Sequence, residues 1–203
     1  MASIASAAEW PSLITDMFVT GTDMSGPNAG IIGVRFYIRG KPWVVTIDDK
    51  LMVDTSGDPV FAESDSNKQA MWGAILEKAW AKVKGNYESS EGGFTVSGLR
   101  SLTGAPVFSY KTEAFSMDST FDLLTAANNA NYAMGAGTSG GLDTSINDCG
   151  IAFGHAYSIL ETFLMNFEGT DIKMVLMRNP WGVTYYSSDW NHSDARWTDA
   201  MKA

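Results

Sequence analysis

The sequence contains one long hairpin pattern, GHAYSILETFLMNFEGTDIKMVLMRNPWG, at residues 154–182. Two apolar runs, 151–165 and 172–177, enclose the turn-rich segment NFEGTD. Apolar runs on both sides of a Gly-containing turn are typical of two antiparallel strands. The pattern therefore predicts a β-hairpin in the second half of the chain, with a histidine near its start and an asparagine near its end.

If this hairpin folds about Phe167, His155 lies twelve residues before the turn and Asn179 lies twelve residues after it. Directly opposed residues of an antiparallel pair project from the same face, with Cβ atoms about 5 Å apart. We therefore expect His155 beside Asn179 on neighbouring strands. The expectation depends on the register, because a slip of one residue sends the two side chains to opposite faces.

An imidazole beside a carboxamide has a definite chemical use. The side-chain oxygen of Asn179 accepts one ring N–H of His155, which fixes the tautomer and leaves the other nitrogen free for a thiol. Cys-His-Asn sets activate a cysteine by stabilising its thiolate against the imidazolium. Trp181 would shield the hydrogen bond from water. The residue types alone also fit a packed structural histidine, with RNPWG as a strand end and a turn.

The rest of the chain predicts an α+β fold. Residues 34–38 alternate inward and outward side chains as a half-buried strand does, and a turn at 40–42 leads to a return strand over 43–47. Apolar side chains recur at helical spacing over 72–83. Before this helix, Ser66 and Gln69 have the spacing of a capping box, and Ser119 has the form of a cap for a short helix further along the chain.

Small residues and glycines indicate how these elements are organised. The segment MASIASAA, residues 1–8, predicts a central buried helix, because Ala and Ser allow close packing on several sides. The pair Gly92-Gly93 predicts a hinge between two units, 1–91 and 92–203. Residues 135–140 match G-x-G-x-x-G without the helix that a dinucleotide site requires next, so we expect a flexible loop there.

Composition excludes several classes of function. The chain has 14 basic and 23 acidic residues, a net charge of −9 and no Lys/Arg cluster, which argues against nucleic-acid binding. Its apolar runs fall short of the roughly 20 residues that span a bilayer, and its amino terminus lacks a secretory signal pattern. The single cysteine, Cys149, excludes an internal disulfide framework. We therefore expect a cytoplasmic protein without a membrane span.

Several motifs together resemble one enzyme family. FGHAYSIL at 153–160 and MRNPWG at 177–182 resemble the His and Asn motifs of the calpain family of cysteine endopeptidases. WVVTIDDKL at 43–51 resembles the family's strand with paired aspartates. AILEKAWAKVKGNYESSEGG at 74–93 resembles its helix before the Gly-Gly junction, and DWNHSDARW at 189–197 its Trp-containing segment. The resemblance spans nearly the whole chain in a consistent order.

The resemblance implies a papain-like cysteine protease core in two subdomains. The first subdomain is helical and carries the nucleophile, and the second contains antiparallel sheet and carries the histidine and asparagine. By this resemblance His155 is the general acid/base, Asn179 orients it, and Trp181 shields their contact. The implied partners are protein or peptide substrates and flanking regulatory domains. Three glycines would let the substrate backbone approach closely: Gly92, Gly93 and Gly154.

The chain departs from the family pattern at the nucleophile. In the family an Asp-Cys-Trp motif opens the helix that continues here as MASIAS, so the cysteine falls about three residues before Met1. We therefore interpret the chain as a fragment, also truncated at its carboxyl end, and predict that it is inactive alone. Cys149 lies close to His155 in sequence, unlike the family's nucleophile, and is interpreted as an ordinary small buried thiol.

The residues expected to bind calcium are altered. The resemblance places carboxylates at positions that hold Ala70, Tyr185 and His192 in this chain, with Asp189 nearby. Hard cations need several oxygen ligands, so we predict no metal ligands and no certain cofactor, although calcium occurs in the family. His192 and the sequon that begins at Asn191 are interpreted as surface loop features.

Two other functions remain open. A calpain-like protein without catalysis, acting as a binding partner or scaffold, fits the absent cysteine and the altered acidic positions. A transglutaminase-like enzyme shares the Cys-His logic but commonly has Asp as the third residue, and RNPWG argues against it.

Overall fold

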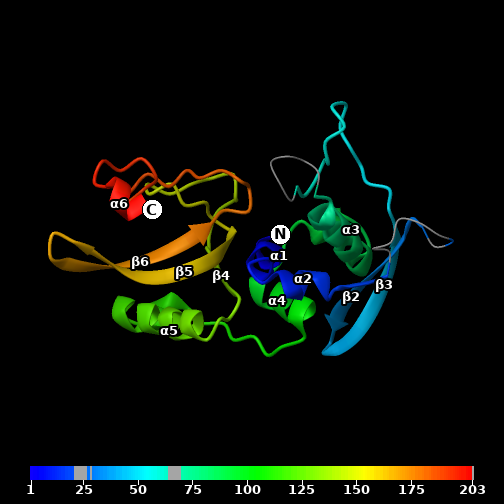
Figure 1. Cartoon of the computed structure of the whole chain (residues 1–203), viewed down its shortest axis with the longest axis horizontal. Helices are drawn as coiled ribbons and strands as arrows, with labels where there is room; N and C mark the ends of the chain where they lie inside the picture. Colours follow the sequence, from blue (N-terminus) through cyan, green and yellow to red (C-terminus); the bar gives the residue numbers. More distant parts are fainter. Residues whose placement is uncertain (21–26, 28, 64–69, 203) are drawn as a thin grey trace.

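The structure is a computed structural model that describes residues 1–20, 27, 29–63 and 70–202. It has an α+β fold with two three-stranded antiparallel sheets, which lie on either side of a central group of helices (Figure 1). The first sheet has the order β1-β2-β3 and the second β4-β5-β6. The strands are β1 Phe18–Thr20, β2 Ile31–Ile38, β3 Lys41–Asp48, β4 Met134–Gly137, β5 Ala156–Phe167 and β6 Thr170–Arg178.

The helices divide among the two sheets and the space between them. Figure 1 shows α1, α2 and α4 between the sheets, α3 against the first sheet and α5 on one face of the second. A short α6 lies near the carboxyl end. The helix bounds are α1 Ala2–Ala7, α2 Pro11–Thr15, α3 Trp72–Lys84, α4 Thr95–Thr103, α5 Met117–Asn129 and α6 Asp199–Lys202, with 3₁₀ turns at Glu88–Ser90 and Thr112–Ala114.

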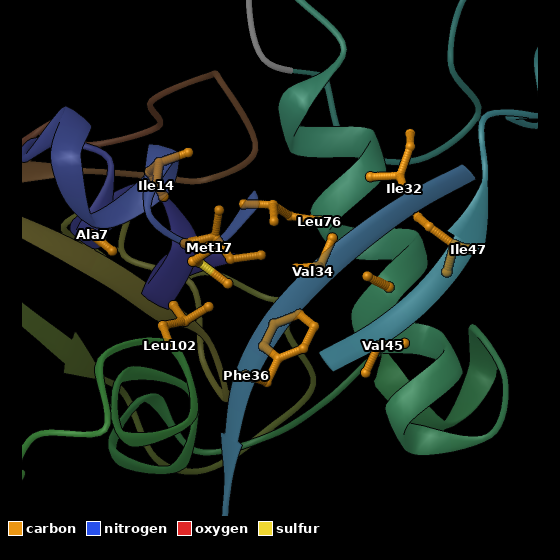
Figure 2. Packing of buried hydrophobic residues seen from close by; sticks show 12 residues of the cluster. Ala7, Ile14, Met17, Ile32, Val34, Phe36, Val45, Ile47, Leu76 and Leu102 are labelled. Carbon is orange, nitrogen blue, oxygen red and sulfur yellow. The ribbon is translucent and has the colours of Figure 1, made fainter. Parts of the chain in front are cut away.

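The first sheet packs on α3 through the predicted strand pattern. Val34 and Phe36 on β2 are fully buried, and Leu76 on α3 is buried with them (Figure 2). The turn between β2 and β3 lies at Arg39-Gly40, both with positive φ, and not at residues 40–42. Two-residue hairpin loops need positive φ at both positions, which explains why Lys41 already belongs to β3.

The predicted central helix is present as α1. The Ser6 hydroxyl donates to the carbonyl of Met134 on β4 at 2.6 Å, and Ser6 is fully buried. The Ser158 hydroxyl on β5 donates to the Ala2 carbonyl at 3.0 Å. Small residues also let α1 approach α4 closely: a Cβ on Gly98 of α4 would lie 2.3 Å from the Ser3 hydroxyl.

Two local expectations differ from the structure, and a third concerns residues outside its described ranges. The cap of α5 is Ser116, whose hydroxyl accepts from the Ser119 backbone N–H, so the cap lies three residues before the predicted position. Residues 134–137 form β4 and pair with β5, so this part of the predicted loop is wrong. The capping box of Ser66 and Gln69 lies outside the described residues.

The structure leaves the division at Gly92-Gly93 as a prediction. α4 follows these glycines, yet its Leu102 belongs to the apolar cluster of the first sheet. No helix within the described ranges is both long and apolar enough to cross a membrane.

Truncation of a core leucine tests this packing. We expect Leu76→Ala to lower the free energy of unfolding by about 2–5 kcal/mol, because the side chain is fully buried and leaves a cavity. The matched control is Leu142→Ala, whose side chain is 72% exposed and whose loss should change stability by less than about 0.5 kcal/mol. Equal unfolding midpoints for the two variants in urea would contradict the assigned core.

Candidate active site

The β5–β6 hairpin turns at Glu168-Gly169, not about Phe167. Both turn residues have positive φ, 51° and 81°, and Phe167 pairs with Thr170. This is the two-residue loop whose twist matches that of the flanking strands. The predicted register, with His155 directly opposite Asn179, is therefore wrong.

A bulge in β5 nevertheless brings His155 and Asn179 to the same face of the hairpin. The ladder pairs Glu161 with Leu176 but Ile159 with Met177, so Leu160 has no partner across the hairpin. An extra residue on one strand sends the following side chains to the other face. With the bulge, the strand end that contains His155 therefore faces the same way as the strand end that contains Asn179.

His155 and Asn179 meet at the end of the hairpin. The His155 Nε2 lies 2.9 Å from the Asn179 Oδ1, in a half-buried position. The backbone N–H of Trp181 also donates to this oxygen at 3.1 Å, which identifies it as the carbonyl oxygen of the side chain. Because that oxygen only accepts, Nε2 carries the proton and Nδ1 has no proton in the neutral ring.

Two aromatic rings enclose the imidazole. The Trp181 ring centroid lies 4.2 Å from that of His155, and the Trp181 side chain is itself 41% exposed. Tyr157 contacts the imidazole edge-on at 4.9 Å. The Tyr157 hydroxyl accepts from the Ala152 backbone N–H at 2.9 Å, closing the segment that leads to His155. Sequence reasoning missed Tyr157, although its place two residues after the histidine puts it on the same strand face.

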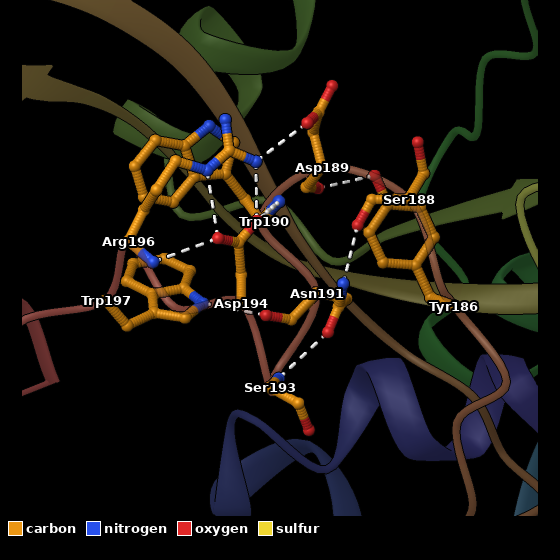
Figure 3. A network of polar contacts seen from close by, with 9 residues as sticks. All are labelled: Tyr186, Ser188, Asp189, Trp190, Asn191, Ser193, Asp194, Arg196 and Trp197. Atoms are coloured by element: carbon orange, nitrogen blue, oxygen red, sulfur yellow. Dashed lines mark hydrogen bonds and ion pairs between the residues drawn. The ribbon is translucent and has the colours of Figure 1, made fainter.

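The segment after Asn179 is held by a charged cluster. Arg196 donates to Asp194 through Nε at 2.9 Å and to Asp189 through Nη2 at 2.7 Å (Figure 3). The guanidinium also lies over the Trp190 ring, 4.4 Å from its centroid. Trp190 in turn contacts Phe167 at the hairpin turn, with ring centroids 5.0 Å apart. The cluster therefore ties this segment to the hairpin.

A surface hollow of about 420 Å³ lies elsewhere, between α5 and the β5–β6 hairpin. Its lining includes Phe121, Phe163 and Lys173 but neither His155 nor Asn179. The candidate site therefore rests on the contacts of these two side chains and not on the shape of the hollow.

Comparison with known proteins identifies the family of the chain. The model of the calpain family cysteine proteases matches residues 1–203. The chain belongs to the calpain family. A calpain-type cysteine protease of Oryza sativa subsp. japonica, ADL1, is 35% identical over 182 residues, which cover 85% of this chain and 8% of that protein. The calpain-1 catalytic subunit of Macaca fascicularis is 30% identical over 202 residues, 97% of this chain and 28% of that protein.

This calpain-family chain thus spans about 8% and 28% of the length of these two relatives. The match places the chain within the protease domain family that the sequence motifs indicated.

Cys149 is exposed, so the expected buried thiol is wrong. Its backbone N–H donates to Asn147 Oδ1 in a turn, and its carbonyl accepts from the Ser187 N–H. The polar turn explains the exposure: Asn147 and Asp148, which precede Cys149 in the same loop, are exposed as well. None of the contacts found in the described residues joins Cys149 to His155.

The three glycines predicted to let substrate approach closely have different surroundings. A Cβ on Gly92 or Gly93 would meet no heavy atom within 4 Å, so the surrounding structure leaves room for a side chain there. Gly154 has a φ of +53°, and a Cβ there would lie 3.1 Å from the Gly141 carbonyl oxygen. The fold itself thus explains glycine at 154, and close approach of substrate to all three stays a prediction.

The positions expected to bind calcium in this family do not form a cation site here. Asp189 accepts from Arg196, a cation of the chain itself, and neighbouring positions hold Tyr185 and His192. In the part of the chain that the structure describes, no group of three His, Cys, Asp or Glu side chains converges. The donor set does not fit a hard cation, which needs several oxygen ligands.

Removing the acceptor of the imidazole proton tests the His155–Asn179 contact. We expect Asn179→Ala to make the His155 ring N–H exchange rapidly with water, so that its signal disappears from a proton–nitrogen NMR spectrum. His192, the other histidine, and the variant Asn166→Ala, which removes an amide elsewhere on the hairpin, are the controls. A ring proton equally protected in Asn179→Ala would contradict the contact.

The charged cluster predicts a dependence of stability on pH. Hydrogen bonds from the Arg196 side chain and backbone hold the pKa of Asp194 below its ordinary value of 3.8. A carboxyl whose pKa is lower in the folded state adds stability above its ordinary pKa, and this is lost as pH falls. We expect Asp194→Asn to be less stable than the native chain near neutral pH, and the difference to shrink below about pH 4.

Urea unfolding at several pH values measures this difference. The control is Asp148→Asn, which removes an exposed carboxylate outside the cluster. A stability difference between Asp194→Asn and the native chain that stays constant down to about pH 3 would contradict the assignment.

Proposed function

We propose that this chain is the core of a calpain-type cysteine endopeptidase that hydrolyses protein substrates by a Cys-His-Asn mechanism. His155 is the general acid/base, Asn179 orients it and Trp181 shields their hydrogen bond. The observation that carries the proposal is the 2.9 Å contact between His155 Nε2 and Asn179 Oδ1. The family membership supports the reaction class.

The tautomer determines how His155 would act. Since Nε2 donates to Asn179, Nδ1 takes the proton of the thiol and leaves a thiolate. The thiolate attacks the peptide carbonyl carbon, and the imidazolium returns the proton to the departing amine. Water then attacks the thioester carbon with His155 as base, which releases the acid and restores the thiol. Asn179 keeps the ring plane constant through both steps.

The family motif places the nucleophile of this proposal about three residues before the position of Met1. The hydroxyl of Ser6 on α1 bonds to Met134, whose strand partner is Ile159. The carbonyl of Ala2 bonds to Ser158, one position closer to His155 on β5. The path from Ser6 back to Ala2 therefore leads along β5 towards the imidazole. Ser158 lies three residues, about 10 Å of extended strand, from His155.

The proposal assigns these elements to a papain-like arrangement of two subdomains. The first subdomain, residues 1–91, would carry the thiol, and the second, residues 92–203, the histidine and asparagine. Substrate would bind between them in the cytoplasm, its backbone passing close to Gly92 and Gly93. The open space around both glycines supports this part of the proposal. Packing does not require glycine at either position, so close approach of substrate is a separate reason for glycine there.

A calpain-like scaffold without catalysis is the second candidate. It is favoured by the contacts of Cys149, which in the described residues do not include His155, and by the engagement of Asp189 with Arg196. The residue at the cysteine position of the upstream coding sequence separates the candidates: a Gln…Gly-Asp-Cys-Trp segment indicates the enzyme, and another residue in place of the Cys indicates the scaffold.

Proteolysis assays test the proposal directly. We expect the 203-residue chain to cleave no casein, and the chain extended by its upstream coding sequence to cleave it in a thiol-dependent way. His155→Ala in the extended chain should lower kcat/KM by about 10²- to 10⁴-fold, because it removes the acid/base. His192→Ala is the matched control. Undiminished cleavage by the His155→Ala variant would refute the role of His155.

A further inference from the structure

Thr138, one residue after β4, forms hydrogen bonds with both the backbone N–H and the backbone carbonyl of His155. The His155 N–H donates to the Thr138 hydroxyl oxygen at 2.9 Å. The Thr138 N–H donates to the His155 carbonyl at 2.8 Å. Both hydrogen-bonding groups of the His155 main chain are therefore engaged by one residue that is distant in sequence.

The Thr138 hydroxyl also serves a second partner. It donates to the Ala152 carbonyl at 2.7 Å, and Ala152 is buried. The Ala152 N–H meanwhile donates to the Tyr157 hydroxyl. The hydroxyls of Thr138 and Tyr157 thus bond to the two backbone groups of Ala152, at the start of the segment that contains His155.

The neighbouring residue cannot provide this restraint. Gly154 has positive φ and no side chain, so the chain entering His155 has the conformational freedom of glycine. His155 itself precedes β5, whose first paired residue is Ala156 opposite Gly137. The sheet ladder therefore begins just after the histidine, and the Thr138 contacts extend the restraint by one residue.

We propose that Thr138 is a positioning residue for His155, and that its hydroxyl keeps the imidazole aimed with Nε2 at Asn179 and Nδ1 at the incoming thiol. The inference deepens the proposed protease function and rests on it. A displacement of about 1 Å in a reacting group lowers catalytic rates by as much as about a hundredfold, so a small backbone shift at His155 has a large effect.

The test compares variants of the 203-residue chain by NMR, which requires no cysteine. Thr138→Val keeps the shape and loses the hydroxyl, whereas Thr138→Ser keeps the hydroxyl. The matched control is Thr103→Val, because the Thr103 hydroxyl likewise donates to a carbonyl, of Leu99, and accepts from a backbone N–H, of Ala105. The readouts are hydrogen exchange of the His155 backbone N–H and protection of its ring N–H.

We expect at least about tenfold faster exchange of both His155 protons in Thr138→Val, and native behaviour in Thr138→Ser and Thr103→Val. Native exchange of both protons in Thr138→Val would overturn the inference. If Thr138→Val does not fold, Thr138→Ala, which also lacks the hydroxyl, decides: faster exchange of both His155 protons supports the role of the hydroxyl, and native exchange of both overturns it.

Activity of the extended, cysteine-containing chain gives an independent readout. Thr138→Val should lower kcat about tenfold to a hundredfold with KM unchanged, and Thr138→Ser should restore it. An equal change of kcat in Thr103→Val would indicate a general loss of structure and contradict the inference. Absence of proteolysis in the native extended chain would defeat the proposed function, while the exchange measurements would still decide the role of Thr138.

Discussion

His155 and Asn179 share a hydrogen bond because the β5–β6 ladder changes register once. The turn at Glu168-Gly169 fixes the pairing at one end of the hairpin, and a regular ladder from that turn would place the two side chains on opposite faces. Because Leu160 is unpaired, the side chains that precede it on β5, towards His155, face the opposite way from those of a regular ladder. The bulge is thus a requirement of the site, and the orientation of Trp181 and Tyr157 around the imidazole follows from the same reversal.

The central helices connect this hairpin to the rest of the molecule. α1 is bonded to β4 and β5 through Ser6 and Ser158, and it packs against α4 through small residues. α4 also contributes to the apolar cluster of the first sheet. Because buried hydroxyls fix α1 against β5, the start of this helix keeps a defined relation to His155. That relation is what a nucleophile from the preceding segment would need.

Sequence reasoning found the pair at the site but not its exact geometry. The alternating and helical patterns predicted β2, β3 and α3, because burial on one face leaves a clear period in the sequence. The His and Asn motifs indicated the family, which the match over residues 1–203 confirmed. The bulge at Leu160 was missed because a single unpaired residue leaves no mark in an apolar run. Thr138 was missed because its contacts with His155 depend on the pairing of β4 with β5, which lies beyond local patterns.

The proposed mechanism requires a thiol beside the start of α1 that is activated by His155. Alkylation of the extended chain with iodoacetamide, followed by mass mapping of the peptides, compares that thiol with Cys149 in the same molecule. At about pH 6 the account predicts much faster modification of the upstream cysteine, because its thiolate is stabilised by the imidazolium, and loss of this preference in His155→Ala. Equal rates for the two cysteines, or a preference that survives His155→Ala, would contradict it.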